Sequence, residues 1–207
     1  MNQLSPPVPV FSNRPLGLFG RLVLWVLGWK VRGDLPTQKK LVLILVPHTS
    51  SWDFAIAIAT RWALDLDARW IGKKELFQGP LGPIMRWMGG VPVDRSRAEH
   101  VVDEVVKRFE GSESFWLGIS PEGTRSYTER WKTGFYRLAL RAKVPLWCAS
   151  LDAKNRCLDL GIVIDLTGDE ATDMARIQSY YSDVTAIHPE RFGPVRLRLP
   201  ENSSDSG

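Results

Sequence analysis

The sequence predicts an α/β fold, with a single domain whose central, mostly parallel sheet is covered by helices on both faces. Two observations lead to this prediction. A length of 207 residues suits one domain with a full hydrophobic core. Short apolar runs also alternate with amphipathic segments along the chain. This is the order of strands and helices that builds a covered parallel sheet.

The composition is that of an ordinary folded domain. Hydrophobic residues make up 44% and charged residues 24% of the chain, which argues against disorder, a collagen-like structure and a polytopic membrane protein. The two cysteines, Cys148 and Cys157, are too few for a disulfide framework and have no His or Cys nearby at zinc-ligand spacing. We therefore expect reduced thiols and no metal.

The two ends of the chain are expected to lie outside the folded domain. Pro6, Pro7 and Pro9 indicate an extended or disordered lead over residues 1–15. Residues 200–207 are expected to form a flexible tail.

Residues 16–32 predict an amphipathic helix that lies in a membrane interface. The apolar run is shorter than the ~20 residues that a spanning helix needs. It also carries basic residues inside and after it, which does not fit a secretory signal. The alternative is a core or partner helix of a soluble domain. The side chains expected to contact the membrane are Leu18, Phe19, Leu22, Trp25 and Trp29.

Positive charge gathers at the N-terminal end. Residues 1–40 hold six basic residues against one aspartate, a net charge of +5, although the whole chain has only +4. A basic segment on a near-neutral body suggests an anionic membrane surface as partner, rather than nucleic acid. Arg21, Lys30 and Arg32 would then lie near lipid phosphates.

The strands are predicted from short apolar runs. Residues 41–46 read LVLILV, a run typical of a fully buried strand, and Pro47 ends it. A turn at the Gly89–Gly90 pair leads into a strand that ends near Arg95. The other predicted strands are 69–72, 115–119, 145–150, 158–165 and 195–199.

The helices are predicted from apolar periodicity and caps. Thr49, Ser50 and Ser51 can cap a helix whose periodicity runs over 54–66. In 97–109, the valines and Phe109 recur at helical spacing. The other predicted helices are 79–88, 135–143 and 170–181.

Polar clusters follow several predicted strands, where open α/β sheets place their ligands. The first cluster holds His48 and Asp53, which can meet across a helix start if the chain turns at Ser50. Asp53 would then fix the imidazole tautomer and His48 would act as a general base. The alternative is ordinary capping chemistry at a helix N-terminus.

The later clusters are rich in arginine and glycine. Arg95, Arg125 and Lys132 could grip a phosphate, with Gly123 allowing close backbone approach. Each arginine could instead pair with a local carboxylate. A serine hydrolase is disfavoured because Pro121, which follows Ser120, has no N–H for an oxyanion hole.

These clusters, in this order, resemble the glycerolipid acyltransferase family that includes bacterial 1-acylglycerol-3-phosphate acyltransferases. The matched motifs are the His-x4-Asp box from His48 to Asp53, the block GGVPVDR, the block from Pro121 to Arg125 and the pair Val144-Pro145. Two positions depart from the family pattern. Pro47 stands where the family often has Asn, and Ser120 where it often has Phe.

The resemblance implies an acyltransferase domain over residues 33–199, with His48 as base and Asp53 as its partner. It also implies transfer from acyl-CoA or acyl-ACP without metal, cofactor or covalent acyl-enzyme. Backbone N–H groups at 49–51 would stabilise the oxyanion. The residues expected around the acceptor's glycerol phosphate are Arg95, Glu122, Gly123, Thr124, Arg125 and Lys132.

The expected function is esterification of a lysophospholipid, most simply 1-acylglycerol 3-phosphate, at the cytoplasmic face of the inner cell membrane. The partners would be an acyl thioester, acyl carrier protein as a possible donor, and an anionic membrane surface. The alternatives are another lyso-lipid acceptor such as a lyso-aminolipid, an inactive lipid-binding protein, and a hydrolase in which water replaces the acceptor.

Overall fold

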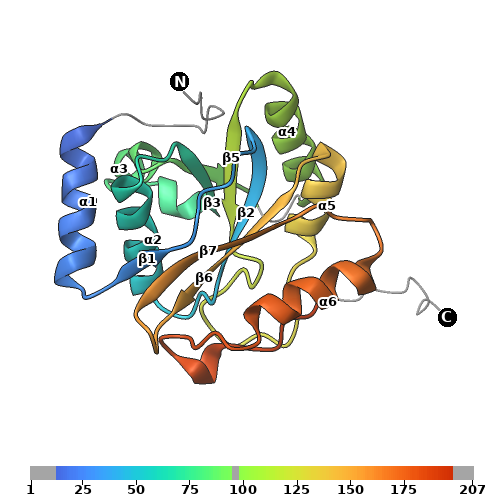
Figure 1. Ribbon diagram of the computed structural model, residues 1–207. Helices are drawn as coiled ribbons and strands as arrows, with labels where there is room; N and C mark the ends of the chain where they lie inside the picture. Colours follow the sequence, from blue (N-terminus) through green and yellow to red (C-terminus); the bar gives the residue numbers. More distant parts are fainter. Residues whose placement is uncertain (1–12, 95–97, 198–207) are drawn as a thin grey trace, which may run out of the picture.

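A computed structural model describes residues 13–94 and 98–197. It contains a seven-stranded sheet in the order β1-β7-β6-β2-β5-β3-β4 (Figure 1). The strands are β1 (Lys30–Arg32), β2 (Lys40–Val46), β3 (Ala68–Lys73), β4 (Gly90–Val93), β5 (Phe115–Ile119), β6 (Leu146–Asp152) and β7 (Cys157–Ile164).

Helices cover both faces of this sheet (Figure 1). Helices α1 and α2 pack on one face, and α4, α5 and α6 pack on the other. The helices are α1 (Arg14–Val26), α2 (Ser51–Ala63), α3 (Gly82–Trp87), α4 (Ala98–Gly111), α5 (Gly134–Ala142) and α6 (Glu170–Tyr181), with short 3-10 helices η1 (Lys74–Phe77) and η3 (Pro189–Arg191). The predicted α/β class is confirmed.

The alternation of side chains along β2 divides the core into two layers. Val42, Ile44 and Val46 face the layer formed with α4, α5 and α6. Leu41 belongs to the opposite layer, beneath α2. Because side chains of a strand point alternately to the two faces, an all-apolar strand indicates a sheet covered on both sides.

The sheet is parallel except where β7 joins it. The pairs β6–β2, β2–β5, β5–β3 and β3–β4 are parallel, whereas β6 and β7 run antiparallel. Only the turn 153–156 joins β6 to β7, which is too short for the crossover that parallel strands need. The predicted strand at 195–199 is reduced to a bridge between Leu197 and Trp131 within the described residues.

The N-terminal helix ends earlier than predicted. Helix α1 stops at Val26, and Gly28 follows with a φ of +69°, the left-handed conformation that often ends helices. Residues 30–32 then form the edge strand β1 instead of the last helical turn. Trp29 is therefore not on the same helical face as Trp25, and it packs against the core layer beneath α2.

Helix α1 is held closely against α2 by a glycine. A Cβ at Gly20 would lie 2.5 Å from the carbonyl oxygen of Ala59 and 2.7 Å from the backbone nitrogen of Ala63. Arg21 Nε also donates to the carbonyl oxygen of Ala63 at 3.3 Å. Among the described helices, none is long and apolar enough to cross a bilayer.

Candidate active site

The candidate site lies at the carboxyl ends of the neighbouring parallel strands β2 and β5. His48 follows β2, and Glu122 follows β5. Parallel neighbours bring their carboxyl ends to one edge of the sheet, so residues 74 positions apart in sequence meet there.

Asp53 organises the turn that carries His48. It is the third residue of α2, and its Oδ2 accepts hydrogen bonds from the backbone N–H groups of Thr49 (2.5 Å) and Ser50 (2.6 Å). The Ser50 hydroxyl accepts from the backbone N–H of Trp52 at 3.2 Å. This is a capping box with aspartate in the acidic position, so both predicted roles of this segment, cap and pair, involve the same carboxylate.

His48 and Asp53 face each other as the sequence predicts. The Nδ1 atom of His48 lies 3.6 Å from Oδ2 of Asp53. This distance is longer than a hydrogen bond, and the carboxylate would attract the imidazole across it when His48 is protonated. Catalytic pairs without substrate are often this long. Asp53 is only 2% exposed, whereas the His48 side chain is 28% exposed and accessible to a substrate.

Burial shifts the acidity of Asp53. Removal from water raises the pKa of this carboxyl above its ordinary value, while the two backbone donors and the positive fields of His188 and Arg125 offset part of the shift. Burial thus favours the protonated form of Asp53, whereas its hydrogen-bond donors and the nearby positive groups favour the carboxylate.

Glu122 supports the histidine through the main chain. Its two carboxylate oxygens accept from the backbone N–H of His48 at 3.1 and 2.9 Å. The Ser120 hydroxyl also donates to Glu122 at 3.3 Å. Glu122 is 4% exposed, and burial raises its pKa to about 7. Glu122 therefore fixes the position of His48 rather than only lining an acceptor pocket as predicted.

The predicted phosphate-binding residues lie beside this pair but do not all converge. Arg125 donates from Nη1 to the Ser51 hydroxyl at the start of α2. Gly123 has a φ of +67°, and a Cβ there would come within 2.8 Å of the Lys132 side chain. Thr124 is exposed, and its hydroxyl accepts from the backbone N–H of Ser126. Arg95 lies outside the described residues.

A C-terminal loop that the sequence analysis missed also binds the turn that carries His48. The backbone N–H of His188 donates to the Thr49 hydroxyl at 3.2 Å, and Arg191 Nη1 donates to the Thr49 carbonyl at 3.3 Å. These contacts span 139 and 142 residues. No local spacing could have revealed them, because only the folded sheet brings the two segments together.

The expected oxyanion donors are occupied. The N–H groups of Thr49 and Ser50 already donate to Asp53, and that of His48 donates to Glu122. The prediction that the 49–51 turn supplies these donors is therefore wrong for Thr49 and Ser50. Within the described ranges, no group of three or more His, Cys, Asp or Glu side chains is arranged to hold a metal ion.

His48 and the buried Asp53 lie at the carboxyl ends of the parallel strands, where open α/β sheets place their ligands. A sequence model of the family described as Acyltransferase matches residues 29–151, more than half of the chain, and the chain belongs to this family. The resemblance found in the sequence motifs is thereby confirmed.

A solved structure has the same fold. The crystal structure of the 1-acyl-sn-glycerophosphate (LPA) acyltransferase PlsC from Thermotoga maritima aligns with a TM-score of 0.54 and 16% sequence identity, over 84% of this chain and 81% of that one. At this identity the similarity concerns the fold. No curated protein matches the chain.

Proposed function

We propose that the protein transfers a fatty acyl group from acyl-CoA or acyl-ACP to the free hydroxyl of a lysophospholipid, most simply 1-acyl-sn-glycerol 3-phosphate. The observation that carries this proposal is the pair formed by His48 and Asp53, at 3.6 Å, inside a chain of the acyltransferase family. The PlsC fold is consistent with it.

In the proposed reaction, His48 acts as the general base. Its Nε2 takes the proton of the acceptor hydroxyl as the hydroxyl oxygen bonds to the thioester carbonyl carbon. Asp53, facing Nδ1, stabilises the imidazolium that forms. The tetrahedral intermediate then breaks its C–S bond, and the proton passes from His48 to the departing thiolate. The products are the new ester and the free thiol.

The acceptor phosphate would bind beside the first turn of α2. Arg125 and Lys132 are exposed cations that flank the Glu122–Gly123 turn, and Ser51 holds the guanidinium of Arg125 at the helix start. Guanidinium and a helix N-terminus both favour phosphate. Phosphate bound there would lie close to His48, as transfer to a glycerol hydroxyl requires.

We further propose that α1 lies on the cytoplasmic face of the inner cell membrane. The apolar face of α1 is exposed although it consists of large side chains, namely Leu18, Phe19, Leu22, Trp25 and Val26. Phe19 contacts Trp62, which in turn contacts the exposed Trp87 of α3, with ring centroids 6.0 and 5.7 Å apart. A continuous apolar surface of this kind is typical of interfacial binding.

Two of the basic residues near α1 have partners within the protein. Arg32 forms an ion pair with Asp159 at 2.6 Å, and Arg21 donates to the Ala63 carbonyl. Both side chains were expected near lipid phosphates. Contact of Arg21, Lys30 and Arg32 with lipid phosphates stays a prediction, and the exposed apolar face of α1 is the stronger support for membrane binding.

The proposal is tested by an acyl-transfer assay in mixed micelles, with acyl-CoA and acyl-ACP as donors and a panel of lyso-lipids as acceptors. We expect product with 1-acylglycerol 3-phosphate, and Arg125→Ala should raise KM for this acceptor by about tenfold or more. Lys154→Ala, which removes a charge from an exposed turn between β6 and β7, should leave KM unchanged. Consumption of neither donor would contradict the proposal, and preference for a lyso-aminolipid would replace the acceptor.

A further inference from the structure

A second polar cleft lies at the opposite end of the sheet from His48. It has a volume of about 600 Å³ and is lined by residues at the start of β3, β4 and β5, including Arg69, Gly90 and Phe115. His48 and Glu122, in contrast, follow the carboxyl ends of β2 and β5. Because these strands are parallel, the cleft is separate from the candidate active site.

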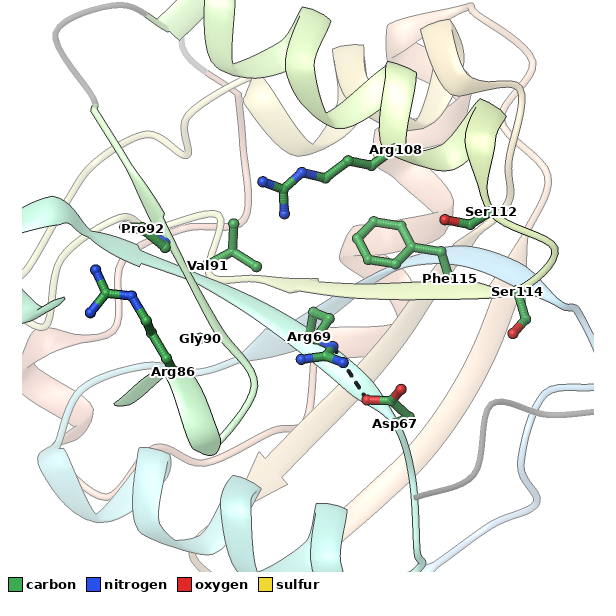
Figure 2. A pocket seen from close by; sticks show the side chains of 10 residues that line it. All are labelled: Asp67, Arg69, Arg86, Gly90, Val91, Pro92, Arg108, Ser112, Ser114 and Phe115. Carbon is green, nitrogen blue, oxygen red and sulfur yellow. Dashed lines mark ion pairs between the residues drawn. The ribbon is translucent and has the colours of Figure 1, made fainter. Parts of the chain in front are cut away.

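Three arginines from three different elements line this cleft. Arg69 comes from β3, Arg86 from α3 and Arg108 from α4. Figure 2 shows Arg108 extending toward the space between Val91 and Phe115, whereas the guanidinium of Arg69 lies next to Asp67 and Arg86 lies on the far side of the strand that carries Gly90 and Val91.

The lining of the cleft holds three arginines but a single carboxylate, that of Asp67. Asp67, the carboxylate in the lining, lies 3.3 Å from Arg69. Arg86 donates to the carbonyl oxygen of Phe77 at 3.0 Å, a neutral group that orients the guanidinium. Among the described residues, no carboxylate pairs with Arg108. The lining therefore has a net charge of +2, which suits an anion with at least two negative charges.

The remaining walls suit an organic group attached to that anion. Val91, Pro92 and Phe115 offer apolar contact, and Ser112 and Ser114 offer hydroxyls. The volume lies in the range of small-molecule sites, ~300–1,000 Å³, and far exceeds the need of one phosphate group. One guanidinium group can donate two hydrogen bonds to two oxygens of the same phosphate, and it can also stack on a planar ring.

From this arrangement we propose that the cleft binds a nucleoside diphosphate, with the diphosphate between Arg69 and Arg108 and the nucleoside against Phe115. A nucleoside diphosphate group can come from two kinds of molecule in a cell. One is a free nucleotide, and the other is the nucleotide portion of CoA.

The test is a calorimetric titration of the purified protein with ADP. We expect binding that weakens as salt is added, and about tenfold or greater loss of affinity in Arg108→Gln and in Arg69→Gln. Lys154→Gln removes one charge from the exposed turn between β6 and β7 and should bind ADP like the parent protein. His48→Ala should also bind ADP normally, which separates this site from the catalytic one.

Competition with CoA identifies the source of the nucleotide. If CoA displaces ADP, the cleft holds the nucleotide of the acyl donor, and Arg108→Gln should raise KM for acyl-CoA but not for acyl-ACP. If ADP binds and CoA does not displace it, the ligand is a free nucleotide. The proposal is overturned if ADP shows no binding at millimolar concentration, or if Arg108→Gln, folded by circular dichroism, binds ADP as tightly as the parent protein.

Discussion

Asp53 both caps the start of α2 and faces the proposed base His48. The same oxygen accepts from two backbone N–H groups and faces the imidazole of His48. The sequence allowed either a cap or a partner of His48 at this position, and in the structure the same carboxylate accepts from the turn and faces the imidazole. Substitutions that keep the cap but remove the charge can therefore separate the two roles.

We predict that Asp53→Asn lowers kcat by about 10²- to 10⁴-fold while the protein remains folded. Asparagine keeps an oxygen that can accept from the Thr49 and Ser50 N–H groups. A neutral acceptor binds them less strongly than a carboxylate, so we expect a stability loss of about 1–3 kcal/mol. Single-turnover rates and thermal unfolding measure the two effects. Asp169→Asn, which changes the N-cap of α6, should leave the rate unchanged. A rate for Asp53→Asn within about threefold of the parent would contradict the role of Asp53.

Glu122 should make stability depend on pH. Its pKa rises from an ordinary value of 4.5 to about 7 in the folded protein because it is buried. The folded state therefore holds this proton more tightly than the unfolded state does. The resulting stabilisation is full below pH 4.5 and is lost as the pH rises through about 7, with a loss on the order of 2 kcal/mol between pH 5 and pH 8.

Urea unfolding at pH 5 and pH 8 tests this prediction. Glu122→Gln keeps an acceptor for the His48 N–H but cannot ionise, so its stability should change less between the two pH values than that of the parent protein. Glu113→Gln, on an exposed side chain before β5, should behave like the parent. Equal pH dependence in Glu122→Gln and the parent would show that Glu122 does not titrate in this range.

At the scale of elements, the contact between α1 and α2 depends on the absence of a side chain. A Cβ at Gly20 would collide with the backbone of α2 at Ala59 and Ala63, and backbone atoms cannot move aside independently. Two helices can approach this closely only where one of them presents glycine.

Gly20→Ala should therefore destabilise the protein by about 1–3 kcal/mol, although alanine favours helices more than glycine. Gly111→Ala is a matched control. Gly111 is the last residue of α4, and a Cβ at this position would meet no atom within 4 Å. It should be neutral or slightly stabilising. Chemical unfolding compares the two, and equal stability of both variants would contradict the close packing of α1.

The apolar face of α1 leads to a separate prediction about membranes. Leu22 and Trp25 are 54% and 78% exposed, so Leu22→Asp combined with Trp25→Asp should leave the fold intact. We expect binding to vesicles of anionic phospholipid to fall by at least about tenfold, because apolar area no longer enters the interface. Sedimentation with vesicles measures it.

The control for this experiment adds a negative charge elsewhere. Ser179→Asp lies on an exposed position of α6, which covers the other face of the sheet, and it should keep vesicle binding. Unchanged sedimentation of the α1 double variant would show that α1 does not contact the membrane.

For the whole molecule, local patterns predicted most of the architecture. Helix α6 was placed at its observed bounds, and the all-apolar run at 41–46 correctly indicated a doubly covered strand. The edge strand β1 was missed because the apolar periodicity of α1 continues past Gly28, although glycine there is a stop signal.

The site was predictable only where its parts are close in sequence. His48 and Asp53 sit five positions apart, and their spacing indicated the pair. The contacts of Glu122, His188 and Arg191 with the 48–49 segment depend on the order of the strands and on how the chain end folds back. Distant contacts of this kind leave no periodic signal in a single sequence.

The measurement that tests the central claim most directly is acyl transfer to 1-acylglycerol 3-phosphate by His48→Ala, compared with His100→Ala. His100 is exposed on α4, so its replacement should leave the rate at the parental value. We predict that His48→Ala loses at least about 10²-fold in kcat while it still binds vesicles and unfolds like the parent. Parental turnover by a folded His48→Ala protein would contradict the assignment of His48 as the general base.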